Sequence, residues 1–199
     1  MNAQTKKRLL LIFIAALFFV PLISSFILFQ QGWRPEGQSN YGTLVEPVKP
    51  LTHLSTLTFE TTDKQSFPLS QLWGRWTLFT VVQDDCTDAC QKNLYKMRQV
   101  RLALNQNARR VQRVLLVNKF DQLSSLDKLQ TEYTGTLLLS GQTAFSTLVK
   151  LLQEATTDAP YQIYVVDPQG NLMMFYPSDA NPSKMLKDLE RLLRLSNVG

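Results

Sequence analysis

The two cysteines of the chain, Cys86 and Cys90, are the residues whose type and spacing best predict chemistry. They follow the apolar, β-branched run 77–82, which predicts a buried strand that passes into a helix. On a helix, a spacing of four residues places both thiols on one face, with a rise of about 6 Å between them. This separation is near the upper end of the range that a disulfide allows. The pair can therefore close a disulfide or hold a soft metal ion between two thiolates.

The surroundings of Cys86 act on its thiol in two opposite directions. A helix N-terminus favours the thiolate form, whereas the negative charges of Asp84, Asp85 and Asp88 oppose it. The three carboxylates are also typical capping residues for a helix that begins here. A redox or metal-binding pair and a static structural disulfide both stay open at this point.

The N-terminal part of the chain predicts one membrane-spanning helix. Residues 9–29 carry no charged side chain and, as a helix, would span roughly 30 Å, the core of one bilayer. No Ala-x-Ala-like cleavage site is evident, and the run is longer than the usual core of a signal peptide. We interpret it as an uncleaved signal anchor, with cleavage after Ser25 as the alternative.

Charge sets the expected orientation of this anchor. Three basic residues, Lys6 to Arg8, precede the apolar run, so residues 1–8 are expected to stay in the cytoplasm. The rest would face outward from the inner (plasma) membrane, into the periplasm or an equivalent space where disulfides persist. Without these three, 18 of the 21 Lys and Arg remain against 16 Asp and Glu, which gives no case for nucleic-acid binding.

Composition divides the remainder of the chain into a linker and one domain. Residues 30–52 are rich in Gly and Pro, so we predict a linker there, and residues 53–199 have the length of one compact domain. Strands are expected at residues 54–60, 66–69, 76–82, 113–117, 136–139, 161–166 and 172–176, and helices at 87–105, 122–132, 143–154 and from Asn181 onward. This order predicts an α/β fold with a mixed sheet flanked by helices on both sides.

A cysteine pair at the end of the first core strand and the start of its helix is the thioredoxin-like arrangement. Residues 72–79 leading into Cys86 and Cys90, and residues 164–172 with their Asp-Pro-x-Gly turn, resemble the Sco/SenC family. With the predicted anchor, the resemblance covers nearly the whole chain. It implies a membrane-anchored, thioredoxin-like protein that helps to assemble the copper centre of cytochrome c oxidase. The implied partners are oxidase subunits or other oxidase assembly factors.

The chain departs from the family pattern at one copper ligand. The family binds copper through both cysteines and a histidine just before the second signature, and the matching position here falls on or near Ala159. The resemblance therefore carries over Cys86 and Cys90 as ligands of Cu(I), but not the complete copper site. The only histidine, His53, is a candidate replacement, and a solvated surface histidine is the alternative. Thioether donors are the other candidates, and each also suits core packing: Met97, Met173 and Met174.

Pro160 suggests a different chemistry for the same region. Thioredoxin-like oxidoreductases place a cis-proline before a strand, facing the cysteines, and Pro160 precedes the strand expected at 161–166. This favours thiol–disulfide exchange through Cys86, Cys90 and Pro160 over copper binding. An ordinary trans proline at the start of a strand is the alternative.

These observations predict a membrane-anchored, Sco-like accessory factor for cytochrome c oxidase assembly. Cys86 would be the attacking thiol and Cys90 the resolving one. The pair would keep the copper-site cysteines of a partner reduced, or hold Cu(I) transiently with a third ligand from the partner. Two alternatives stay open: a general periplasmic thiol–disulfide oxidoreductase, and a non-catalytic assembly scaffold whose copper site has decayed.

Overall fold

The structure is a computed structural model that describes residues 3–31, 40–156 and 162–196. The chain falls into two units, Met1–Ser39 and Asn40–Gly199. The described part of the first unit is the helix α1 (Ala3–Gln30), which contains Pro21. Among the described residues, α1 alone is long and apolar enough to cross a membrane, with a mean hydropathy of 2.7 in its most apolar window. The predicted candidate span is therefore confirmed.

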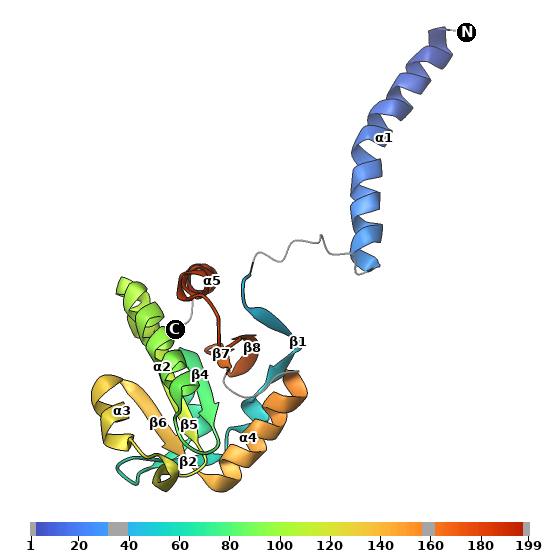
Figure 1. The fold of residues 1–199 in the computed structure, drawn as a ribbon. Coiled ribbons are helices and arrows are strands. Elements are labelled where there is room, and N and C mark those ends of the chain that lie inside the picture. The colour runs from blue at the N-terminus through green and yellow to red at the C-terminus, as the bar shows by residue number, and fades with distance from the viewer. Residues whose placement is uncertain (1–2, 32–39, 157–161, 197–199) are drawn as a thin grey trace. The chain divides into compact units, whose positions relative to one another are not determined.

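The second unit is built on a mixed sheet, which within the described residues has eight strands in the order β1-β8-β7-β4-β5-β6-β2-β3 (Figure 1). Its strands are β1 (Thr43–Pro50), β2 (Thr58–Thr61), β3 (Ser66–Pro68), β4 (Trp76–Val82), β5 (Val111–Val117), β6 (Thr136–Ser140), β7 (Ile163–Val166) and β8 (Asn171–Tyr176). The central strands β4, β5 and β6 are parallel, and the other neighbours are antiparallel. Every residue of β4 is buried, as expected for a strand covered on both faces.

Helices cover both faces of this sheet (Figure 1). On one face lie α2 (Asp88–Ala103), α3 (Leu126–Glu132) and α5 (Pro182–Leu195), whose apolar side chains form one core with the sheet. On the other face lies α4 (Gln142–Ala155), with a second core. Right-handed crossovers explain why α2 and α3 share one face, because the chain moves in the same direction across the parallel strands β4, β5 and β6.

Most of the helices and strands predicted from the sequence are present in the structure. The strand expected at 76–82 is β4, and the predicted mixed sheet with helices on both sides is confirmed. Asn181 caps α5 as predicted, because its side-chain oxygen accepts a hydrogen bond from the Ser183 N–H at 2.9 Å. Pro182 occupies the first turn of that helix.

The prediction of a linker over residues 30–52 is wrong for its second half. Residues Thr43–Pro50 form β1, which pairs with β8 at the edge of the sheet. Pro47 and Pro50 made this segment resemble a linker, but an edge strand tolerates proline because one side of its backbone pairs with no other strand. The compact unit accordingly begins at Asn40 rather than at His53.

A buried carboxylate binds the start of this unit to its last helix. Asp188 accepts hydrogen bonds from the backbone N–H of Tyr41 (2.9 Å), the N–H of Gly42 (2.8 Å) and the hydroxyl of Tyr176 (3.2 Å). Burial, followed by the charge of Asp188, raises the pKa of Tyr176, so the phenol remains a donor. A Cβ atom at Gly42 would lie 2.6 Å from the Tyr176 ring, so glycine is required at this contact.

Candidate functional site

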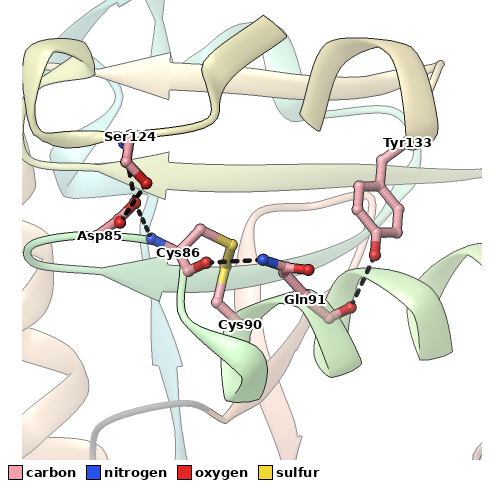
Figure 2. The surroundings of a disulfide bond; sticks show 6 residues. All are labelled: Asp85, Cys86, Cys90, Gln91, Ser124 and Tyr133. Carbon is pink, nitrogen blue, oxygen red and sulfur yellow. Dashed lines mark hydrogen bonds between the residues drawn. A yellow bond between two sulfur atoms is a disulfide. The ribbon is translucent and has the colours of Figure 1, made fainter. Parts of the chain in front are cut away.

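Cys86 and Cys90 form a disulfide where β4 passes into α2 (Figure 2). Their Cα atoms are 5.1 Å apart, which lies within the usual range for a disulfide. Cys86 precedes the helix, whose N-cap is Thr87, and Cys90 lies in its first turn. The prediction that both thiols share one helical face is therefore wrong: the pair joins the preceding turn to the helix.

Both cysteines are buried in the core beneath α2. Cys86 is 3% exposed and Cys90 0%. A nucleophile must approach along the axis of the S–S bond, so exchange with a partner requires the turn before α2 to open. Opening of this turn exposes Cys86 first, because it lies outside the helix whereas Cys90 is held within it.

Asp85 connects the turn between β4 and α2 to the loop before α3 (Figure 2). We call this turn, residues 83–87, the disulfide turn because it contains Cys86. One carboxylate oxygen accepts hydrogen bonds from the Cys86 N–H (2.8 Å) and the Ser124 N–H (3.1 Å), and the other accepts from the Ser124 hydroxyl (2.6 Å). The hydroxyl and N–H of Ser124 lower the pKa of Asp85; the Cys86 N–H adds to this effect and burial opposes it. The prediction that Asp85 caps α2 is therefore wrong.

A second set of hydrogen bonds holds the other side of the disulfide (Figure 2). The side-chain amide of Gln91 donates to the Cys86 carbonyl at 3.2 Å, and the Tyr133 hydroxyl donates to the Gln91 carbonyl at 3.2 Å. Burial, followed by the charge of Glu132, raises the pKa of Tyr133, and Arg98 opposes this shift. Ser124, before α3, thus bonds to Asp85 in the turn, and Tyr133, after α3, bonds to Gln91 in α2.

Sequence reasoning missed Ser124, Gln91 and Tyr133. The hydrogen bonds of Ser124 to Asp85 and of Tyr133 to Gln91 span 39 and 42 residues, and no local pattern marks a hydroxyl that will be used at such a distance. The helix predicted at 122–132 included Ser124, whereas α3 begins at Leu126, so no signal in the sequence indicated that Ser124 would lie in the loop before the helix.

The described residues do not form a complete metal site. Within them, no group of three or more His, Cys, Asp or Glu side chains is placed to hold a metal ion. Cys86 and Cys90 would supply two soft thiolate ligands in the reduced state. Met97 and Met174 are buried in the core and Met173 packs against it, so the three methionines have the packing role.

His53 is not placed to complete this site. It is exposed in a short 3-10 helix, η1 (Thr52–Leu54), which follows β1. The neighbouring Leu51 N–H donates to Gly170 in the β7–β8 turn at 2.8 Å. Because β7 is antiparallel to β4, that turn lies beside the start of β4, whereas the disulfide follows its end. His53 therefore lies at the opposite end of the sheet, and the hypothesis that it is the third ligand is wrong.

Ala159 and Pro160, the positions of the family histidine and of the expected cis-proline, lie outside the described residues. The next described strand in the sequence is β7. β7 pairs with β4 so that Tyr164 is opposite Phe79 and Val166 is opposite Thr77. The first residues of β7 therefore lie toward the end of β4 from which the disulfide turn emerges.

The sheet order and the disulfide together define a thioredoxin-like domain. Residues 76–196 match the family model described as "Transmembrane-like, thioredoxin-like, C-terminal domain". The chain belongs to this family. No curated protein matches the sequence.

Solved structures of Sco proteins share the fold. Apo Sco1 from Thermus thermophilus is 18% identical with a TM-score of 0.61, over 79% of this chain and 99% of that one. Copper-bound ScoI from Bradyrhizobium japonicum is 17% identical with a TM-score of 0.55, over 68% and 96%. BsSco is 17% identical with a TM-score of 0.54, over 80% and 98%. At these identities the likeness establishes the fold, and the predicted resemblance to the Sco/SenC family is confirmed at that level.

Proposed function

We propose that this protein is a membrane-anchored, outward-facing accessory factor for cytochrome c oxidase assembly that works by thiol–disulfide exchange. The observation that carries the proposal is the Cys86–Cys90 disulfide at the junction of β4 and α2. The oxidase context comes from the shared fold: BsSco is described as a member of the Sco family of cytochrome c oxidase assembly proteins, with a disulfide switch.

The exchange begins with the reduced pair. The Cys86 thiolate attacks one sulfur of a partner disulfide, forms a mixed disulfide and releases one partner thiolate. The Cys90 thiolate then attacks the Cys86 sulfur and releases the second partner thiolate. The partner disulfide gains two electrons, and Cys86 and Cys90 lose two as they close their own bond. A dithiol donor in the same compartment returns the pair to the reduced state.

The places of the two thiols in the fold support the roles proposed for them. Cys86 lies ahead of the N-terminus of α2, where unpaired backbone N–H groups stabilise a thiolate. Cys90 is fully buried in the first turn, where its sulfur can reach Cys86 but not a partner. Pro160 is proposed to contact the partner chain beside the pair, because β7, the strand that follows it in the sequence, begins at the same end of the sheet.

Membrane attachment is assigned to α1. Its basic flank is expected to remain in the cytoplasm, so the thioredoxin-like domain is proposed to lie on the outer side of the inner membrane. In such a compartment both the dithiol and the disulfide are accessible states.

Transient handling of Cu(I) as cargo is the second candidate function. The observation that favours it is the shared fold with ScoI, which has been solved with copper bound. The reduced cysteines would be two of the ligands, and a partner would supply the third, because the described residues offer none. Competition between the reduced full chain and a Cu(I) chelator tests this candidate, with Cys86→Ser as the variant expected to lose binding.

Trapping of the mixed disulfide tests the exchange mechanism. A Cys90→Ser variant of the full chain cannot resolve the bond at Cys86, so a covalent adduct with an oxidase subunit or assembly factor is expected on non-reducing gels. The Cys86→Ser variant is the matched control and should trap nothing. Full oxidase content in a strain that carries the double serine variant would contradict the proposal and favour a non-catalytic scaffold. Adducts with many unrelated proteins would favour a general oxidoreductase.

A further inference from the structure

The basic residues of the thioredoxin-like domain are concentrated on α2, on α5 and on the 3-10 helix η3 (Asn105–Arg110) that follows α2. These elements, residues 88–110 and 182–195, contain ten Lys and Arg against three Asp and Glu. The rest of residues 30–199 has eight Lys and Arg against thirteen Asp and Glu. The near-neutral total therefore conceals two regions of opposite charge. One of the three acids, Asp188, is buried and already engaged by its donors.

The two long helices that carry this charge lie side by side on one face of the sheet (Figure 1). Hydrogen bonds from α2 and from η3 reach the chain at the two ends of α5. Lys96 donates to the Ser178 carbonyl just before α5, and the Arg110 guanidinium donates to the carbonyls of Leu193 (2.8 Å) and Ser196 (2.7 Å) at its end. We refer to the exposed side chains of α2 and α5 as the α2–α5 face.

Exposed apolar side chains lie among these basic residues. Tyr95 and Leu102 on α2, and Leu195 at the end of α5, are each more than half exposed. Tyr95 and Leu102 are seven residues apart, which places them on the same side of the helix. Apolar side chains that project between Lys and Arg are typical of surfaces that lie in the headgroup layer of a membrane.

The chain that leads to α1 leaves the domain at this face. Tyr41 and Gly42 are bound to α5 through Asp188, the Tyr41 hydroxyl accepts from the Asn181 N–H at 3.1 Å, and Lys184 lies 4.8 Å from the Tyr41 ring centroid. Nine residues, 31–39, connect Gln30 to Asn40. A chain of that length spans at most about 30 Å when fully extended. If α1 is in a membrane, α5 cannot move far from its surface.

We propose that the α2–α5 face docks onto anionic phospholipid headgroups of the membrane that holds α1. The inference rests on the membrane anchoring assigned under the proposed function. Anionic headgroups attract exposed Lys and Arg within about one Debye length, roughly 8–10 Å at moderate salt, and the short connection keeps the face close enough for contact. Since α2 begins at the disulfide, docking holds Cys86 and Cys90 at a fixed height beside membrane-embedded partners.

A spin label on the outer side of α2 tests this docking in the full chain. Leu102→Cys provides one free thiol, because the native cysteines are joined. The labelled protein is reconstituted in nanodiscs of phosphatidylcholine, with or without phosphatidylglycerol, and the access of oxygen and of a nickel chelate is measured. We expect a shift toward oxygen in the anionic discs, and its loss at high salt. A label at Gln153→Cys, exposed on α4 across the sheet, should show no such shift.

Charge reversal provides the matched control. Lys92→Glu, Arg98→Glu, Lys187→Glu and Arg194→Glu together should abolish the shift at position 102. Lys64→Glu, Arg75→Glu, Lys119→Glu and Lys150→Glu change the net charge equally on other surfaces and should preserve it. Equal access in both kinds of disc, with the protein integrated, would overturn the proposal and point to a protein partner for this face. Failure of the chain to integrate into any disc would instead contradict the anchoring itself.

Discussion

Two carboxylates of this protein, Asp85 and Asp188, make the same set of hydrogen bonds in different surroundings. Each accepts from two backbone N–H groups and one hydroxyl, and each joins segments that are far apart in sequence. Asp188 is buried and fixes the start of the domain, whereas Asp85 is partly exposed and holds the disulfide turn. Water can replace the hydrogen bonds to Asp85 at small cost in free energy. Breaking the hydrogen bonds to Asp188 instead leaves buried donors without an acceptor. The disulfide turn can therefore open while the domain remains closed.

The largest effect is expected from Asp188→Ala. It leaves the N–H groups of Tyr41 and Gly42 and the Tyr176 hydroxyl without their acceptor in a buried site, which should lower the free energy of unfolding by roughly 3–5 kcal/mol. Denaturant unfolding of the full chain, followed by tryptophan fluorescence, measures the loss. Glu190→Ala, an exposed acid on the same helix, should change stability by less than about 0.5 kcal/mol. Equal losses of stability in both variants would contradict the special role of the buried Asp188 carboxylate.

Gly42→Ala should come next. The added methyl group would lie 2.6 Å from the Tyr176 ring, and overpacking of this kind costs about 1–3 kcal/mol. The same unfolding experiment measures it. In a Tyr176→Leu background the ring is absent, so the alanine should cost less there. A cost that does not depend on residue 176 would show that the contact is not the reason for the glycine.

Asp85→Asn should lower the global stability only slightly but speed the reduction of the disulfide by dithiothreitol several-fold. The substitution weakens the acceptor of the Cys86 N–H and of Ser124, so the turn opens more often. The rate of thiol release in the native protein measures the effect. Asp88→Asn removes a nearby charge without these hydrogen bonds and separates the two causes. Equal acceleration by both variants would mean that charge repulsion, and not opening of the turn, limits the reaction.

The smallest effect concerns acid pH. The pKa of Asp85 is lower in the folded than in the unfolded protein, so the unfolded state binds more protons in acid. The stabilisation by Asp85 is therefore complete above its unfolded pKa of about 4 and is lost as the pH falls through the folded value. The difference in unfolding midpoint between the parent and Asp85→Asn, measured from pH 7 downward, should shrink in that window. A constant difference would contradict the ionised role of Asp85.

Sequence patterns predicted the elements whose causes are local. The buried run of β4 and the Asn181 cap of α5 are written in consecutive residues, and both are confirmed. β1 was missed because its partner, β8, lies more than a hundred residues away, and its prolines hide the strand pattern. A partner far along the chain supplies the hydrogen bonds that local propensity does not indicate.

The sequence predicted the two cysteines of the site but not the residues that surround them. The spacing of Cys86 and Cys90 indicated a disulfide-capable pair, but the hydrogen bonds from Ser124 and Tyr133 depend on where α3 packs. The α2–α5 face could not be predicted from the sequence either, because the net charge sums over the whole chain and does not show where the charges lie in the fold. Its concentration on one side appears only when α2 and α5 are brought together by the core beneath them.

β1 pairs with β8, and Tyr41 and Gly42 donate hydrogen bonds to Asp188 of α5. These contacts join the start of the domain to its end, so they set the order in which the domain can fold during synthesis. The first strand of the domain has no partner until the final segment of the chain has been synthesised. β1 therefore stays unpaired while the central strands of the sheet are being synthesised. α5 then supplies Asp188, which accepts hydrogen bonds from Tyr41 and Gly42, and chains cut short before β8 are left with β1 unpaired for quality-control proteases to recognise.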